Sequence, residues 1–254
     1  MGIATPVLAR RRAAFVAVGA CVGTWFVVAP HLPHVGLWPA IVIVSVAVLP
    51  ATLSLVYIAL PLWPKRWLLP AVFALALVAL VCTLADWGLA ANFAKLWAAV
   101  FAGWAFLSLF EQLSWVVLVA CVIPAVDAIS VWRGPTKAIT AHHFEVYTTV
   151  AIAFLVPGGG AAYLGPPDIL FYALFLAAAA RWRLRVGWTW FAMTFMYSFT
   201  VVLANALDVS GLPALPFLSF GFLVANADLL WRSIRPSAGS SASPSSSGDG
   251  RAPS

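Results

Sequence analysis

The sequence predicts an all-α fold, a polytopic bundle of transmembrane helices. Hydrophobic residues make up 63% of its 254 residues and charged residues only 9%, whereas a soluble domain of this size carries far more charge. Apolar runs long enough to cross a bilayer recur along the chain. Basic residues fall in short clusters between these runs, which is typical of membrane orientation. The net charge of +6 therefore does not predict nucleic acid as a partner.

Eight apolar runs are long enough to be predicted as membrane spans. They cover residues 13–29, 37–60, 67–85, 89–110, 112–132, 165–180, 187–206 and 212–231. A ninth apolar stretch, residues 144–156, is short for a span and is expected to be re-entrant or interfacial. The prediction is therefore a bundle of eight spans, with nine as the alternative.

The basic clusters give these eight spans a consistent orientation. If Arg10–Arg12 lie in the cytoplasm, the later clusters at residues 65–66, 181–185 and 232–235 fall on the same side. Only Arg133 and Lys137 fall outside, in agreement with the positive-inside rule. The sequence therefore predicts an integral membrane protein with both termini cytoplasmic. The Ser-rich tail, residues 236–254, is expected to be disordered.

Two aspartates occur at neighbouring ends of predicted spans. Asp127 lies near the end of the fifth span, and Asp168 lies near the start of the next one. Because these spans are antiparallel and joined by one loop, the two ends share a leaflet. A carboxylate at this depth is costly unless it faces the protein interior or a water-filled cavity. Two facing carboxylates can share a proton, and such a pair can activate water and protonate a carbonyl group.

A simpler interpretation is that each aspartate caps a helix or lies at the level of the lipid headgroups. Asp168 in particular lies near a helix start, where a carboxylate is a favourable cap and partner of the helix dipole. Spacing alone leaves both interpretations open.

Three motifs around these residues resemble the presenilin and signal peptide peptidase family of intramembrane aspartyl proteases. The stretch VDAISVWRGPTKAI, which contains Asp127, resembles the first active-site helix of that family. The stretch YLGPPDILFY, which contains Asp168, resembles its Gly-x-Gly-Asp motif, and LPALPF at residues 212–217 resembles its Pro-Ala-Leu motif. The motifs occur in the family's order, each at the appropriate end of an apolar run.

The resemblance implies a function and a set of site residues. It implies an intramembrane aspartyl protease that cuts transmembrane helices or signal peptides, in a prokaryotic plasma membrane, without metal or organic cofactor. Asp127 and Asp168 would be catalytic. The supporting residues would be Gly165, Pro167, Pro213, Ala214 and Leu215. The chain would divide into a four-span half (1–110), a catalytic half (111–235) and the tail (236–254).

The sequence departs from the family pattern at two positions. Val126 stands where the family has a tyrosine, and Pro167 stands where it has the glycine that precedes the second aspartate. Proline fixes φ and lacks an N–H group, although it is tolerated in the first turn of a helix. Two alternatives therefore remain: a catalytically inactive homologue that binds membrane helices, and a small transporter that uses the same aspartates as an ion relay.

The β-branched segment before Gly158 is a candidate substrate-binding strand. A membrane protease must unwind its substrate helix, and a local strand could pair with the unwound segment by β-augmentation. Its candidate residues are Thr149, Val150, Ala151 and Ile152. A re-entrant or surface helix is the alternative. The nearby sequence HHFE at residues 142–145 lacks the spacing of a metal site.

Overall fold

The structure, a computed structural model, describes residues 4–62, 67–133, 144–209 and 212–234. The predicted tail lies outside the described residues, as do Lys65, Arg66, Lys137 and both histidines of HHFE. The helices and strands follow the chain as α1 (Ala4–Val28), η1 (Ala29–His31), α2 (Leu37–Ile43), η2 (Val44–Val48), α3 (Leu49–Ala59), η3 (Leu60–Leu62), α4 (Leu68–Leu84), α5 (Gly88–Leu107), α6 (Leu113–Arg133), α8 (Phe144–Val150), β1 (Ile152–Leu155), β2 (Ala161–Leu164), α9 (Pro166–Arg181), α10 (Val186–Ala206) and α11 (Leu215–Ile234).

Each of the eight apolar runs forms a helix, and the predicted all-α bundle is confirmed. In the described part of the chain, five helices are long and apolar enough to cross a membrane: Leu8–His31, Leu37–Ala59, Gly88–Leu107, Leu113–Arg133 and Val186–Ala206. The helices α4, α9 and α11 are not among these five, so the count of eight spans is not confirmed. At 16 residues, α9 is about 24 Å long, shorter than the roughly 30 Å hydrocarbon core of a bilayer.

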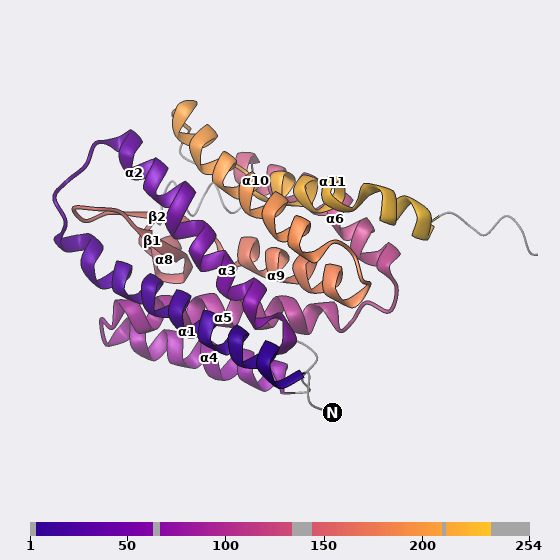
Figure 1. Ribbon diagram of the computed structural model, residues 1–254. Helices are drawn as coiled ribbons and strands as arrows, with labels where there is room; N and C mark the ends of the chain where they lie inside the picture. Colours follow the sequence, from indigo (N-terminus) through magenta and orange to yellow (C-terminus); the bar gives the residue numbers. More distant parts are fainter. Residues whose placement is uncertain (1–3, 63–66, 134–143, 210–211, 235–254) are drawn as a thin grey trace, which may run out of the picture.

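Helix α9 lies at the centre of the bundle. It packs against α5 on one side and against α10 and α11 on the other, as Figure 1 shows. All of its residues from Tyr172 to Ala179 are buried. The ring of Phe175 stacks on Phe222 of α11 with centroids 4.8 Å apart. The surrounding helices therefore shield α9, which explains how a helix this short is accommodated.

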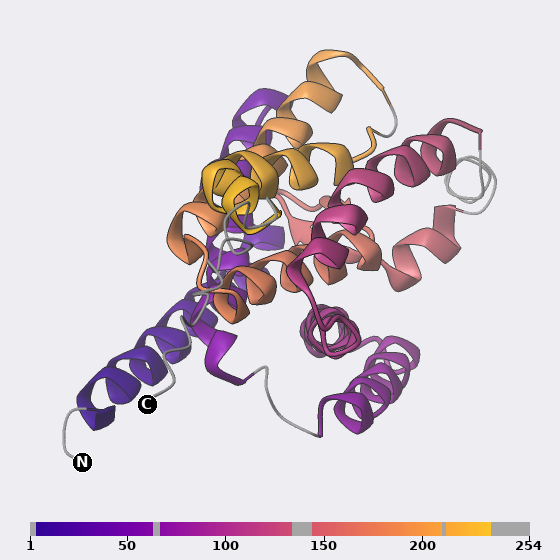
Figure 2. The ribbon, with the colours of Figure 1, turned by 90° about the vertical axis from the view of Figure 1, so that its right-hand side faces the viewer.

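The helices α5 and α9 make a close contact in the core. A Cβ atom added to Gly103 of α5 would lie 3.2 Å from the Cβ of Ala173 and would overlap the carbonyl group of Leu170. Small residues at such a crossing let two helix backbones approach each other, which is a common device in membrane bundles. Figure 2 shows α5 nearly end-on beneath α9, with α4 on its outer side. The position of α9 is thus set by Gly103.

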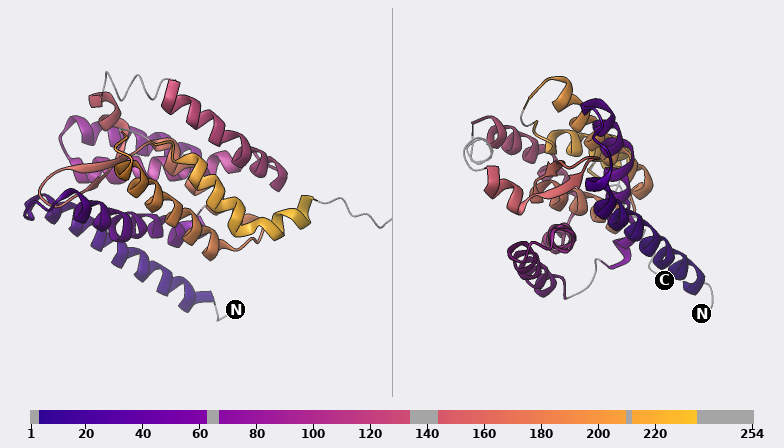
Figure 3. Two further views of the ribbon diagram at one scale, coloured as in Figure 1. Left: turned by 90° about the horizontal axis from the view of Figure 1, so that it is seen from above. Right: turned by 90° about the vertical axis from the view of Figure 1, so that its left-hand side faces the viewer.

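The helices α1 and α6 lie on opposite sides of the bundle (Figures 2 and 3). Only 11% of the residues in the most apolar window of each are buried. On α6 the exposed large apolar residues recur at helical spacing: Trp115, Leu118, Val122, Val126 and Ile129. An apolar stripe of this kind is suited to contact with lipid chains.

The ninth apolar stretch forms a short helix and a strand. The seven residues of α8 lead into β1, which pairs antiparallel with β2 so that Ile152 faces Leu164. The hairpin tip contacts the connection between α1 and α2. There the N–H of Gly158 donates to the carbonyl oxygen of Ala29 over 3.1 Å. Gly158 has a φ of 84°, and an added Cβ would lie 2.6 Å from the Cα of His34, so only glycine fits there.

Candidate active site

Asp127 and Asp168 lie on two neighbouring helix ends and are both half-buried. Asp127 belongs to the last two turns of α6, and Asp168 is the third residue of α9. The two carboxylates lie close enough for their charges to interact. The structure thus brings together the two aspartates that the sequence pairs.

The carboxylate of Asp168 is held at the start of its own helix. The N–H of Gly165 donates to Oδ2 of Asp168 over 3.1 Å, and the N–H of Asp168 donates to the carbonyl oxygen of Gly165, also over 3.1 Å. The carboxylate bond is one half of a capping box, and a backbone bond takes the place of the other half because glycine has no side chain. A Cβ added to Gly165 would lie 3.3 Å from Oδ2, so the glycine leaves room for the carboxylate. Asp168 therefore caps its own helix, as the simpler interpretation of the sequence expected, and it also lies near Asp127.

Pro167 occupies the second position of α9 and is exposed. The N–H groups of a helix's first turn have no acceptor within the helix, so a proline there removes no helical hydrogen bond. Gly165 itself has an extended backbone, with φ of −69° and ψ of 148°. The double proline therefore starts α9 without distorting it, and Asp168 follows in the first turn.

The carboxylate of Asp127 is held at the start of a different helix. The N–H of Leu215, the first residue of α11, donates to Oδ2 of Asp127 over 3.0 Å. The backbone N–H of Ala214 lies near the same carboxylate. A negative charge is favourable at a helix N-terminus. The buried Pro213 precedes these donors. The Pro-Ala-Leu residues thus contact Asp127 through their backbone.

Val126 does not face the bundle interior. Its side chain is 53% exposed, on the outward stripe of α6. The valine that stands in place of the family's tyrosine therefore forms part of the apolar outer surface of α6.

Three tyrosines surround the carboxylates, and the sequence analysis did not identify them. Tyr172 lies one turn after Asp168 on the same face of α9, and its hydroxyl is 2.9 Å from that of Thr194. Tyr197 of α10 lies against Tyr172 with ring centroids 6.1 Å apart. Burial and the neighbouring Asp168 raise the pKa of Tyr147 in α8 to about 12, so its phenol remains neutral at physiological pH. In the sequence, the four-residue spacing of Asp168 and Tyr172 was the one indication that a tyrosine lies on the same helix face as the aspartate.

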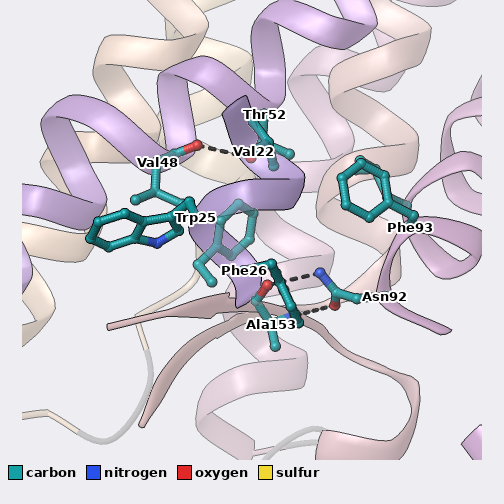
Figure 4. Close-up of a pocket in the computed structure, with 10 residues that line it drawn as sticks. Val22, Trp25, Phe26, Val48, Thr52, Asn92, Phe93 and Ala153 are labelled. Carbon is teal, nitrogen blue, oxygen red and sulfur yellow. Dashed lines mark hydrogen bonds between the residues drawn. The ribbon is translucent and has the colours of Figure 1, made fainter. Parts of the chain in front are cut away.

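The β1–β2 hairpin, which precedes Asp168 in the chain, is anchored by α1 and α5. The side chain of Asn92 in α5 bonds both backbone groups of Ala153: its amide donates to the carbonyl oxygen over 2.9 Å and its oxygen accepts from the N–H over 2.7 Å. The indole of Trp25 in α1 donates to the carbonyl oxygen of Leu155 over 2.9 Å. Figure 4 shows Asn92 bonded to Ala153 beside Trp25 and Phe93, around a small, mostly apolar pocket.

The four candidate substrate-binding residues do not form one strand. Thr149 and Val150 are helical, Ala151 is a bend, and the strand begins at Ile152. The hydroxyls of Thr148 and Thr149 donate to the carbonyl oxygen of Glu145 over 3.0 and 2.7 Å, which stabilises the helical turn. The expected strand is therefore wrong for its first part. The outer edge of β1 is also occupied by Asn92.

No protein-family model, curated protein or solved structure matches the chain. In the described residues, no group of three or more histidine, cysteine or acidic side chains is placed to hold a metal ion.

Proposed function

We propose that the protein is an intramembrane aspartyl protease of the presenilin-like type, which hydrolyses peptide bonds of transmembrane helices or signal peptides. The observation that carries the proposal is the arrangement of Asp127 and Asp168. Their charges interact, and each carboxylate is fixed by backbone N–H groups at the start of a helix. Fixed carboxylates are already in position when the substrate arrives, which is what catalysis by proton transfer requires.

The proposed reaction is hydrolysis without a metal or organic cofactor, because two carboxyl groups can perform both proton transfers. The ionised carboxylate takes a proton from water, and the water oxygen attacks the peptide carbonyl carbon. The protonated carboxyl gives its proton to the carbonyl oxygen. The C–N bond then breaks as the nitrogen takes up the proton that the first carboxylate removed from water, and one hydroxyl of the intermediate returns a proton to the second carboxylate. One water is consumed, and one carboxyl and one amino terminus are formed.

The hydrogen bonds support an assignment of the two roles. Asp127 accepts the N–H of Leu215 and also lies near the backbone N–H of Ala214, whereas Asp168 accepts the N–H of Gly165. Hydrogen bonds to a carboxylate favour its charged form. We therefore propose Asp127 as the base that activates water and Asp168 as the acid.

The hairpin is the proposed binding element for the unwound substrate. Asn92 occupies the outer edge of β1, so an added substrate strand belongs on the β2 side. Strand β2 runs through Gly165 directly into Asp168, which would carry a paired substrate to the carboxylates.

The proposed setting is a prokaryotic plasma membrane, with both termini and the tail in the cytoplasm. The start of α1, the α9–α10 connection and the end of α11 lie toward one end of the molecule (Figure 1). In the sequence these segments carry Arg10–Arg12, the arginines at residues 181–185 and Arg232. Arg133 is the last residue of α6, and this end of α6 lies toward the other end of the molecule (Figure 1). This distribution supports the positive-inside orientation and a structure of eight spans.

The proposal is tested with purified protein in liposomes and a synthetic transmembrane peptide. Wild type is expected to cut the peptide, and Asp127→Ala and Asp168→Ala are expected not to cut it. A lack of cutting by wild type across several peptides, with peptide binding retained, would favour the inactive homologue. In that case, gain of cutting by Pro167→Gly would locate the defect at the proline.

The transporter alternative is tested on the same liposomes. Proton or ion flux that requires both aspartates, without peptide cleavage, would contradict the protease and support transport. No flux is expected, because a carboxylate bonded to helix-terminal N–H groups is poorly placed to relay ions.

A further inference from the structure

Tyr197 of α10 carries a buried hydroxyl with no hydrogen-bond partner among the described residues. The residue is only 1% exposed. Buried polar groups in folded proteins are nearly always bonded, and an exception calls for an explanation. An unpaired hydroxyl is expected where a group that binds only during function supplies the missing partner.

Tyr197 lies beside the candidate active site. Its ring packs on Tyr172, with centroids 6.1 Å apart, and Tyr172 follows Asp168 by one helical turn. Asp127 and Asp168 both lie within electrostatic range of the Tyr197 phenol. The hydroxyl bonds neither carboxylate directly.

The neighbouring tyrosine provides a contrast. Tyr172 is equally buried, but its hydroxyl bonds that of Thr194 over 2.9 Å. Thr194 lies one turn before Tyr197 on α10. Where α9 and α10 meet, the hydroxyls of Tyr172 and Thr194 are therefore bonded to each other, whereas the hydroxyl of Tyr197 has no partner among the described residues. Tyr172 therefore has a structural bond, and Tyr197 has none.

We propose that Tyr197 is a third catalytic residue of the proposed protease, and that its hydroxyl donates a hydrogen bond to the oxygen of the scissile carbonyl as that oxygen gains negative charge. The inference rests on the proposed function. A phenol is neutral at physiological pH, and its hydroxyl can donate a hydrogen bond. A fixed donor aimed at developing charge stabilises the transition state more than the bound substrate. The phenol proton stays on Tyr197 throughout, so the balance of the hydrolysis is unchanged.

The test compares Tyr197→Phe with the matched control Tyr172→Phe. Each variant removes one buried hydroxyl from the same ring pair. We expect Tyr197→Phe to lower kcat about 100-fold, at the low end of the range for a lost oxyanion donor, with KM and the melting temperature nearly unchanged. Tyr172→Phe is expected to lower the melting temperature, because it breaks the bond to Thr194, and to lower kcat far less than Tyr197→Phe does. Equal kcat for wild type and Tyr197→Phe would overturn the inference.

A second measurement does not depend on turnover. A transmembrane peptide is prepared with a hydroxyethylene group in place of one peptide bond, and its Kd is compared with that of the unmodified peptide. The loss of Tyr197 is expected to weaken binding of the hydroxyethylene peptide about 10-fold while the unmodified peptide is little affected. Equal binding of the hydroxyethylene peptide by wild type and Tyr197→Phe contradicts the inference, as does its failure to bind wild type.

The two measurements separate the inference from the proposed function. If the aspartate variants are inactive and Tyr197→Phe behaves like wild type, the protease function stands and the role of Tyr197 fails. If wild type does not cut but Tyr197→Phe still weakens the hydroxyethylene peptide selectively, the protease function fails and Tyr197 remains a donor in the binding site.

Discussion

The two halves of the chain contribute different things to the same site. The half from α6 to α11 supplies the polar groups at its centre, namely Asp127, Asp168 and the N–H donors of α11. The half from α1 to α5 supplies the supports, which are Asn92 and Trp25 against the hairpin and Gly103 against α9. One hydrophobic cluster runs through both halves. The three family-like motifs contain the aspartates of the proposed site, but the elements that hold them in place lie mostly outside these motifs.

The largest effect is expected at the two carboxylates. Asp127→Asn and Asp168→Asn keep an oxygen that can accept the helix-terminal N–H groups, so the fold is retained while the proton chemistry is lost. Each variant is expected to reduce kcat at least about 10³-fold, and the double variant no further, because the two groups act as a unit. Peptide cleavage followed by mass spectrometry measures the effect.

Asp208→Asn is the matched control for these variants. Asp208 is exposed and has a φ of 52°, a conformation that asparagine also tolerates. This variant is expected to retain wild-type activity. A comparable loss of activity in Asp208→Asn, or full activity in Asp127→Asn or Asp168→Asn, would contradict the claim that the two carboxylates differ in role from other acidic residues.

The next effect is expected at the α5–α9 crossing. Gly103→Ala forces α9 away from α5, because its Cβ would overlap the carbonyl group of Leu170 and lie 3.2 Å from the Cβ of Ala173. Overpacking of this kind lowers the free energy of unfolding by up to about 3 kcal/mol. Because α9 carries Asp168, kcat is expected to fall as well. Thermal unfolding and peptide cleavage measure the two changes.

The control for Gly103 is Gly187→Ala in α10, where nothing lies within 4 Å of the added Cβ. Alanine favours the helix over glycine, so the stability of this variant is expected to be equal or slightly higher. If both glycine variants behaved alike, the N-terminal half would have no positioning role through α5.

A smaller effect is expected at the hairpin anchor. Asn92→Ala leaves the N–H and carbonyl groups of Ala153 without their side-chain partner, which costs about 1–2 kcal/mol. Faster hydrogen exchange is expected in β1 and β2. Asn205→Ala removes an exposed bond within one helix, to the carbonyl oxygen of Val201, and is expected to change the free energy of unfolding by less than about 0.5 kcal/mol. Unchanged exchange in the hairpin of Asn92→Ala would contradict the anchoring role.

The smallest effect is expected at the ion pair between α10 and α11. Arg185 and Asp228 are 2.7 Å apart, but their side chains are 48% and 43% exposed. Exposed pairs contribute at most about 1 kcal/mol, so Asp228→Asn is expected to leave cleavage unchanged and to lower the melting temperature slightly. A large loss of activity would show that this connection also positions the site.

Much of the helical arrangement follows from hydropathy, because a run of apolar residues needs little context to form a helix in lipid. The pairing of Asp127 with Asp168 also follows from chain order and helix direction. The number of spans could not be predicted from hydropathy. Neighbouring helices shield α9 from lipid, so its length is not tied to the thickness of the bilayer. The bonds of Asn92 to Ala153 join residues 61 positions apart, and no local pattern announces such a contact. The role of Tyr197 depends on the same kind of distant packing.

The most direct test of the central claim is cleavage in water enriched in oxygen-18, with the purified protein in liposomes and a synthetic transmembrane peptide. The account predicts products cut within the apolar segment by wild type, each new carboxyl terminus carrying one oxygen-18 atom, and no products from Asp127→Asn or Asp168→Asn. Intact peptide after incubation with wild type, or the same products from either variant, would contradict the claim that these two carboxylates activate water for peptide hydrolysis.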